Sequence, residues 1–275
     1  QRLFAKVPAT QRMLRVSSDL FMDIMVTLAM WRFRQFRPVN RIAAAIGRLH
    51  RFAAIRDREL RRKLTPSYDF GCKRPTLSNV YYRTFNKPHV HLETAGIDRI
   101  EADGIVGADG TKRVIDTLVL ATGFDVWESN LPAIEVIGRE GRDLGKWWRE
   151  NRFQAYEGLA VPLFPNMLSQ ASPYAWVGMS WFDTVEYQMR HMERLFGEMQ
   201  RTGARTFEVT EEANARFLDR MLTLLDDSVF LLGNCANSRS YWFNSSGEAP
   251  LFRPTTVRQA VKEQQHFPLS DYALA

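Results

Sequence analysis

Two adjacent cations lie between a glycine and a proline in the segment Gly71-Cys-Lys-Arg-Pro75. The flanking residues restrict the backbone, and cations on a restricted backbone suit recognition of an anion. Lys73 offers a compact point charge suited to a phosphate, whereas Arg74 offers a planar fork that stays charged at any working pH. A merely solvated surface pair is the alternative that these residues alone leave open.

A second candidate is the run Asp116-Thr-Leu-Val-Leu-Ala-Thr-Gly-Phe124. Residues 118–120 are apolar without alternation, which is typical of a strand buried on both faces. Residues 121–123 are too small to fill a core, and ligands of open α/β sheets bind outside the carboxyl ends of strands. The run predicts a cofactor contact, and a plain glycine turn after a buried strand is the alternative.

Metal, hydrolytic and disulfide chemistry receive little support from the sequence. His89, His91 and Glu93 would share one face of a strand, but no further cluster of ligands accompanies them, so we expect no metal site. No G-x-S-x-G nucleophile motif is present. Cys72 and Cys235 show no CxxC spacing and no disulfide framework, which fits buried thiols in a reducing, cytoplasmic compartment.

The chain has 275 residues and a net charge of +6, and its composition fits a globular protein of roughly two domains. Residues 1–64 hold 15 Lys and Arg against four Asp and Glu. A solvated helical face, an anionic membrane surface or an attracted nucleotide phosphate would each account for this basicity. No nucleic-acid motif accompanies it, and the longest apolar stretch, residues 20–31, is too short to span a bilayer. We expect no nucleic-acid partner, and membrane contact is not favoured.

The elements that must position these residues change along the chain. Two apolar sets at helical spacing predict helices separated by Pro38, namely Leu20, Ile24, Leu28 and Trp31, and then Ile42, Ile46, Leu49 and Phe52. Short β-segments follow, with Asp103-Gly104 and Asp109-Gly110 as hairpin turns of a meander. Beyond the strand at Leu118, we expect a short helix around Trp147-Trp148 and long helices over about 180–200 and 211–225.

Several motifs, taken in chain order, together resemble a type I Baeyer-Villiger flavin monooxygenase of the flavin-containing monooxygenase superfamily. They are Gly71-Cys-Lys-Arg-Pro75, Tyr81-Tyr82, the meander, the Leu-Ala-Thr-Gly-Phe strand end, Phe164-Pro-Asn166, Ser172-Pro173 and Ser240-Tyr-Trp242. The resemblance covers nearly all of this chain, but only the C-terminal half to two-thirds of a full family member. The Lys-Arg pair behind a basic helical segment is its most specific part.

The resemblance implies an incomplete α/β fold of the FAD/NAD(P)-binding class, with two dinucleotide-binding domains. Residues 1–64 would form a helical insertion domain, and residues 65–115 the returning part of the NADP-binding domain with its β-meander. Residues 116–275 would form the returning part of the FAD-binding domain with the C-terminal helices.

The resemblance also implies roles for particular residues. Lys73 stands where the family recognises the 2′-phosphate of NADP, and Arg74 where it keeps a catalytic arginine that stabilises the anion formed from reduced flavin and oxygen. The other implied cofactor contacts are Ala121, Thr122, Gly123, Phe124 and Pro173 near FAD, and Tyr241 and Trp242 near the nicotinamide. We expect the wall of the substrate pocket to include Tyr174, Trp176 and Met179.

The sequence departs from the family pattern in two places. It contains no G-x-G-x-x-G, so neither phosphate-binding turn is present, and Ser172 stands where the family often has a glycine near the flavin. Because the chain opens at Gln1 without an initiator methionine, we expect a piece of a longer protein whose missing N-terminal portion is needed to bind the cofactors, and which is inactive alone.

The implied reaction inserts one oxygen atom of O2 beside a ketone carbonyl, or onto a soft heteroatom, with NADPH as reductant. Two alternatives stay open. The first is a heteroatom-oxidising flavin monooxygenase or another pyridine-nucleotide flavoprotein. The second is a non-enzymatic module whose basic helices bind a membrane surface or an acidic partner.

Overall fold

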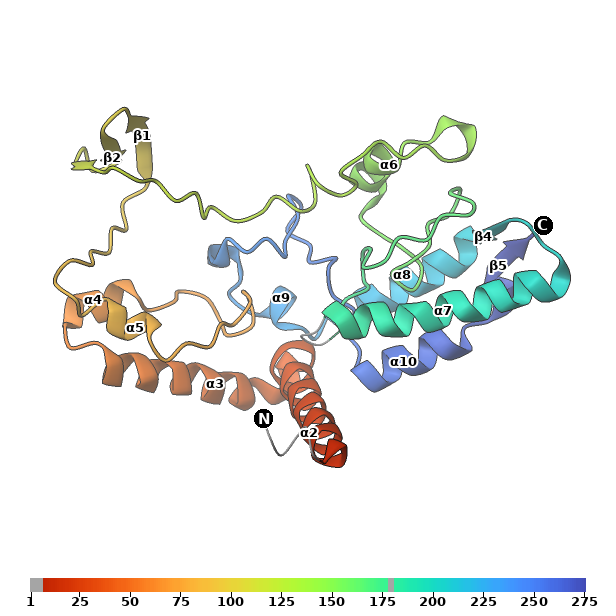
Figure 1. Cartoon of the computed structure of the whole chain (residues 1–275), viewed down its shortest axis with the longest axis horizontal. Coiled ribbons are helices and arrows are strands. Elements are labelled where there is room, and N and C mark those ends of the chain that lie inside the picture. Colours follow the sequence, from red (N-terminus) through yellow and green to blue (C-terminus); the bar gives the residue numbers. More distant parts are fainter. Residues whose placement is uncertain (1–6, 178–180) are drawn as a thin grey trace. The chain divides into compact units, whose positions relative to one another are not determined.

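A computed structural model describes residues 7–177 and 181–275, and its chain divides into two compact units (Figure 1). Unit 1 comprises the described parts of residues 1–41, 68–74 and 125–275, and unit 2 comprises residues 42–67 and 75–124. No described helix is both long enough and apolar enough to cross a membrane.

The N-terminal helices break at a different place from the one that the sequence predicts. Helix α2 (Pro8–Val26) continues into a π-helical turn, η1 (Thr27–Trp31), and α3 (Phe33–Ala54) starts beyond Arg32. Pro38 lies inside α3, so the prediction that Pro38 separates the two helices is wrong. Proline distorts the backbone just before itself, and α3 accordingly consists of two helical segments that meet at a kink at the non-helical Phe36 (φ −115°, ψ 31°).

Unit 2 contains the predicted meander. Strands β1 (Ile97–Glu101), β2 (Gly104–Gly107) and β3 (Lys112–Val114) form an antiparallel sheet in chain order, so this prediction is confirmed. Gly104 is required at the first turn, because a Cβ there would collide with the carbonyl oxygen of Arg113 on β3. The helical elements of unit 2 are the end of α3, α4 (Arg58–Lys63) and α5 (Tyr81–Thr84).

The run predicted to be a buried strand is neither a strand nor buried. Residues 117–123 have no regular secondary structure, and Val119 and Leu120 are 79% and 76% exposed. No hydrogen bond joins the backbone of residues 118–123 to any other described residue. A strand needs a neighbour to pair with, and the described chain offers these residues none.

Unit 1 holds the larger core. Its remaining elements are η2 (Arg139–Gly141), α6 (Leu144–Asn151), α7 (Trp181–Thr202), β4 (Phe207–Val209), α8 (Glu211–Leu225), α9 (Val229–Leu232), η3 (Ala236–Ser238), α10 (Val257–His266), η4 (Leu269–Asp271) and β5 (Tyr272–Leu274). The three helices predicted for this region are confirmed as α6, α7 and α8. Strands β4 and β5 form an antiparallel pair, and α7 and α10 run side by side (Figure 1).

Helix α8 shows why some of these elements could be predicted. Thr210 caps its first turn, where the side-chain oxygen accepts a hydrogen bond from the Ala213 N–H at 3.2 Å. Glu211 and Glu212 follow in the first turn, where negative charge is stabilised by the helix dipole. The cap and the acidic turn are both local, so the sequence alone displays them.

A disulfide joins Cys72 to Cys235 in unit 1, so the expectation of two free thiols is wrong. The two residues are 163 positions apart in the sequence, and the fold brings their Cα atoms to 5.1 Å. Such a pairing leaves no spacing pattern, because the intervening fold creates the proximity. The expectation that Cys72 is buried is confirmed.

We expect loss of this disulfide to destabilise unit 1, because the bond closes a very long loop and so constrains the unfolded chain. The double variant Cys72→Ser/Cys235→Ser should lower the free energy of unfolding by about 2–5 kcal/mol. Thermal unfolding measured with and without dithiothreitol checks this. The reductant should shift the midpoint of the original protein and leave that of the double variant unchanged; equal midpoints for both would contradict the prediction.

His191 of α7 is fully buried and uncharged in the fold. Its ring stacks on Phe267 with centroids 3.7 Å apart, and Nε2 lies 2.8 Å from the Tyr272 hydroxyl. Burial, reinforced by the nearby cations Arg253 and Arg194, lowers the pKa of His191 to about 3. A protonated imidazole is therefore disfavoured inside this core.

The stability of unit 1 should consequently depend on pH. The pKa of His191 is lower in the folded than in the unfolded state, so its contribution is full above about pH 6.5 and is lost as the pH falls toward 3. Between pH 7.5 and pH 5 the loss should be about 2 kcal/mol. The free energy of unfolding, measured with urea at both pH values, should change less with pH in His191→Gln than in the original protein. An equal change in both proteins would assign the acid sensitivity to other groups.

Candidate functional site

The loop that carries Lys73 and Arg74 is fixed on its N-terminal side by several contacts within unit 1. Asn40 Nδ2 donates to the Phe70 carbonyl oxygen at 2.6 Å, and the Asn234 N–H donates to Asp69 Oδ2 at 2.9 Å. The Cys72–Cys235 disulfide adds a covalent link at the residue directly before Lys73. The backbone directly before the two cations is thus held by both hydrogen bonds and a bond between side chains.

Gly71 makes this tight attachment possible. Its φ is +98°, a conformation that favours glycine, and a Cβ there would lie 3.0 Å from Met30 Cγ and 3.4 Å from Val229 Cγ1. The sequence interpretation of a restricted backbone before the cations is therefore supported by the structure, although the restriction comes from packing and the disulfide as well as from the glycine itself.

Both cations are exposed and unneutralised. Within the described parts of the chain, no carboxylate forms an ion pair with Lys73 or Arg74. The Arg74 guanidinium instead lies over the indole ring of Trp176, 5.4 Å from the ring centroid. An aromatic face attracts a cation without cancelling its charge, so the N–H groups of Arg74 keep their capacity to bind an anion.

Trp176 belongs to a set of aromatic residues that connects three of the site residues predicted from the sequence. Its ring stacks on Phe252 with an interplanar angle of 19° and centroids 5.9 Å apart, and Trp242 meets the same Phe252 edge-on at 4.6 Å. Arg74, Trp176 and Trp242, predicted as catalytic, substrate-pocket and cofactor residues, are therefore linked through Phe252. The sequence offered no signal for Phe252, which is an ordinary buried phenylalanine.

The segment before Trp176 is buried. Pro173 and Tyr174 are covered, and the Tyr174 N–H donates to the Pro250 carbonyl oxygen at 2.6 Å. The Ser172 hydroxyl is also buried and has no hydrogen-bond partner among the described residues. A buried hydroxyl without a partner is available to a bound group, so Ser172 does not by itself conflict with a cofactor nearby. Met179 lies outside the described residues.

The remaining predicted site residues fall in different places. Tyr241 is next to Trp242 in unit 1, with ring centroids 6.4 Å apart, and its carbonyl oxygen accepts from Trp127 Nε1 at 3.1 Å. Residues 121–124 lie in unit 2, on the exposed run. Gly123 has φ +102° there, and a Cβ at this residue would meet no other described atom within 4 Å. Their cofactor contacts stay predictions.

His89, His91 and Glu93 do not lie on a strand. Glu93 pairs with Arg113 of β3 at 2.6 Å, and no group of three metal-ligating side chains occurs among the described residues.

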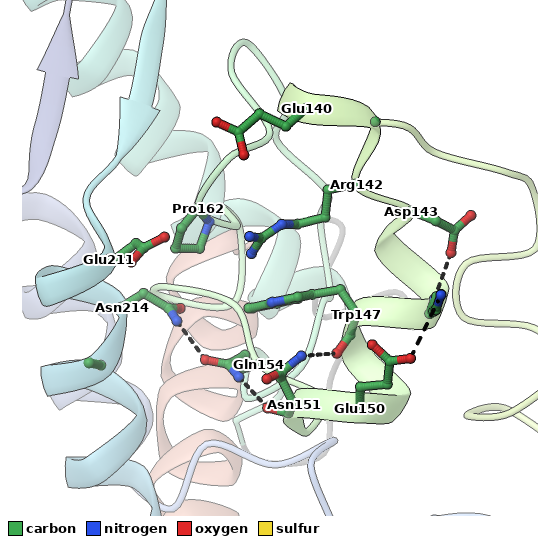
Figure 2. A pocket seen from close by; sticks show the side chains of 13 residues that line it. Glu140, Arg142, Asp143, Trp147, Glu150, Asn151, Gln154, Pro162, Glu211 and Asn214 are labelled. Carbon is green, nitrogen blue, oxygen red and sulfur yellow. Dashed lines mark hydrogen bonds and ion pairs between the residues drawn. The ribbon is translucent and has the colours of Figure 1, made fainter.

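A polar pocket in unit 1 was not anticipated from the sequence (Figure 2). Its volume is about 720 Å³, and it lies between α6, the loop before it and the start of α8. Arg142 lies over the Trp147 ring at 5.8 Å, and Asn214 Nδ2 donates to Gln154 Oε1 at 2.7 Å. The residues come from segments about 60 positions apart, so no spacing in the sequence displays them together. The pocket shares no residue with the Lys73–Arg74 loop.

No family model matches the chain. It is 31% identical over 223 residues to a Baeyer-Villiger monooxygenase of Streptomyces coelicolor, covering 80% of this chain and 42% of that protein. It is 30% identical over 236 residues to a Baeyer-Villiger monooxygenase of Pseudomonas aeruginosa, covering 86% of this chain and 44% of that protein. The chain thus spans less than half the length of these curated relatives.

Solved structures that are similar to this chain are also those of monooxygenases. The closed crystal structure of cyclohexanone monooxygenase superposes with a TM-score of 0.75 at 27% identity, over 86% of this chain and 45% of that one. The complex of OTEMO with FAD and NADP superposes with a TM-score of 0.74 at 24% identity, which shows the fold alone. The predicted FAD/NADP-binding fold, present in part, is confirmed. The chain is a homologue of the C-terminal part of type I Baeyer-Villiger monooxygenases, as its motifs predicted.

Proposed function

We propose that this chain is part of an FAD- and NADPH-dependent monooxygenase that inserts one oxygen atom of O2 beside a ketone carbonyl. The observation that carries the proposal is the Lys73–Arg74 pair, which is exposed, unneutralised and held on a fixed loop. The pair occurs in a chain whose relatives are named Baeyer-Villiger monooxygenases, and a solved relative is cyclohexanone monooxygenase.

In this proposal the two cations have separate tasks. Lys73 binds the 2′-phosphate of NADP(H), since an ammonium group without a carboxylate partner suits a phosphate. Arg74 stabilises negative charge that develops beside the flavin ring, which is the effect of a positioned, permanently charged donor. FAD and NADPH, when bound, would supply the electrons and the activation of oxygen.

Further residues would hold the cofactors and the substrate. Residues 121–124 would contact FAD, with Pro173 near the flavin and Tyr241 and Trp242 near the nicotinamide. Tyr174, Trp176 and Met179 would border the ketone. The same proposal assigns residues 1–64 to a helical insertion, 65–115 to the NADP domain and 116–275 to the FAD domain.

The FAD site would need a further portion of polypeptide. The backbone of residues 118–123, which bonds to no other described residue, and the exposed Val119 and Leu120 match a strand whose sheet lies outside the described residues. The sequence also has no G-x-G-x-x-G turn to bind a pyrophosphate. We propose that the part of the relatives' length that this chain does not span supplies both.

The same proposal includes a cytoplasmic location. The proposed use of NADPH is now the remaining reason for it. The absence of a disulfide framework favoured it, but the Cys72–Cys235 bond removes that reason, because disulfides are rare in reducing compartments.

Replacing Arg74 tests the proposed reaction. In the complete, flavin-loaded protein, Arg74→Ala should lower the rate of ketone oxidation about 100- to 1,000-fold, because it removes one positioned charge from the site of reaction. Product formation from cyclohexanone, followed by mass spectrometry, measures this.

Lys73→Ala is the matched control for Arg74→Ala. It should raise the KM for NADPH about tenfold or more while leaving the rate at saturating NADPH nearly unchanged. If Arg74→Ala oxidises ketones as fast as the original protein, the proposed role of Arg74 is wrong. If the original protein oxidises amines or sulfides but no ketone, the heteroatom-oxidising alternative is favoured instead.

A second candidate function is favoured by one face of α3. Ile42, Ile46, Leu49 and Phe52 recur at helical spacing as predicted, but all four are 61–69% exposed in unit 2. An exposed apolar stripe on a basic helix is typical of segments that lie on anionic membranes. This observation supports the alternative of a basic helical module.

Binding to vesicles tests the second candidate. If α3 lies on membranes, the protein should sediment with phosphatidylserine vesicles at low salt and be released by about 0.5 M salt, and Ile46→Asp/Phe52→Asp should abolish sedimentation. Vesicles of phosphatidylcholine serve as the control. Equal recovery with both lipids, or none with either, would exclude this function.

A further inference from the structure

The backbone before Arg74 is restricted, so the position of the guanidinium depends mainly on the conformation of the arginine side chain. The Cys72–Cys235 disulfide and the hydrogen bonds of Asp69 and Phe70 fix the residues before it. The arginine side chain itself has several rotatable bonds, and its conformational entropy opposes any single orientation. A catalytic arginine needs some contact that offsets this cost.

The structure provides one such contact, the face of Trp176. The guanidinium carbon lies 5.4 Å from the ring centroid, within the range in which a cation is attracted by an indole face. A carboxylate could orient the guanidinium as well, but it would pair with the charge and occupy the N–H donors. The indole orients Arg74 and leaves its donors available to an anion.

Trp176 is rigid enough to perform this task. The residue is 9% exposed, and its backbone N–H donates to the Leu251 carbonyl oxygen at 3.1 Å. Its carbonyl oxygen accepts from the Arg253 N–H at 2.9 Å, so the residue is bridged to the segment around Phe252 on both sides. Phe252 then stacks against the indole. The ring therefore has a defined orientation before any ligand binds.

We propose that Trp176 is a positioning residue for Arg74, holding its guanidinium on the indole face so that the charge stays in place and unneutralised. The inference rests on the proposed function of Arg74, and it gives Trp176 a role distinct from lining the substrate pocket. It predicts that the effect of Trp176 on the rate at saturating ketone passes through Arg74.

The complete, flavin-loaded protein tests this with Trp176→Leu, Trp176→Phe and a matched control, Trp31→Leu. Trp31 is buried and also contacts Phe252, with centroids 5.4 Å apart, but no cation–π contact joins it to Arg74 among the described residues. Both leucine variants thus remove an indole from the same aromatic set. Only Trp176→Leu removes the contact with Arg74.

Trp176→Leu should lower the rate of ketone oxidation about 3- to 30-fold, which corresponds to loss of a partly buried cation–π contact. Trp176→Phe, which keeps an aromatic face, should recover part of this loss. The dissociation constant of NADP⁺, which reports on Lys73, should stay within about twofold. In the Arg74→Ala background, Trp176→Leu should cause no further loss of the rate at saturating ketone, since for this step the two residues act as one unit.

A spectroscopic readout independent of turnover completes the test. The Nε–Hε resonance of Arg74, assigned by its absence in Arg74→Ala, should shift in Trp176→Leu and stay in place in Trp31→Leu, because the indole ring current is lost only in the former. If Trp176→Leu does not load flavin, the same resonance and the rate of Trp176→Phe decide the question.

Two results would overturn the inference, and each differs from failure of the proposed function. One is equal behaviour of Trp176→Leu and Trp31→Leu in rate, NADP⁺ affinity and resonance position. The other is a loss from Trp176→Leu that persists in the Arg74→Ala background. By contrast, full ketone oxidation by Arg74→Ala would reject the proposed role of Arg74 in the reaction while leaving the resonance shift, and hence the contact, intact.

Discussion

The arrangement of the candidate site depends on the fixed backbone between Asp69 and Cys72. A disulfide, two hydrogen bonds and a glycine packed against Met30 and Val229 hold this short segment to the core of unit 1. Lys73 and Arg74 follow immediately, so the core restricts the backbone that leads to them even though both residues are exposed. Exposed cations are usually mobile and weakly oriented. Here the contacts of residues 69–72 with the core of unit 1 restrict the backbone that precedes the two cations.

The features predicted correctly from the sequence are those determined by neighbouring residues. The Asp-Gly turns of the meander and the threonine cap with its acidic first turn at α8 are local signals, and the structure contains both. The Lys73–Arg74 pair was selected by the same kind of local signal, since a glycine and a proline flank it, and its roles stay predictions. None of these needs knowledge of what lies elsewhere in the fold.

The features that were missed are those created by distant residues. The disulfide joins positions 163 residues apart, and the pocket between α6 and α8 is formed by segments that are also far apart in sequence. The apolar run at residues 118–120 shows the opposite error. Its composition is that of a buried strand, but burial requires a sheet around it, and the described chain does not provide one. The composition of residues 118–120 therefore indicates that this segment needs a sheet around it, and the described residues contain no such sheet.

The contact between Arg74 and Trp176 explains how an exposed charge can be ordered without being neutralised. An ion pair with a carboxylate would hold the guanidinium more strongly, but an arriving anion would then have to displace the carboxylate and would gain less from the exchange. A cation–π contact is weaker, and the ring face leaves the hydrogen-bond donors at the edge of the guanidinium unused. The buried stack with Phe252 fixes the ring, so the cost of ordering is met largely by residues that never touch the anion. In the proposed function, the charge of Arg74 thus stays available to an anion because its neighbour is aromatic rather than acidic.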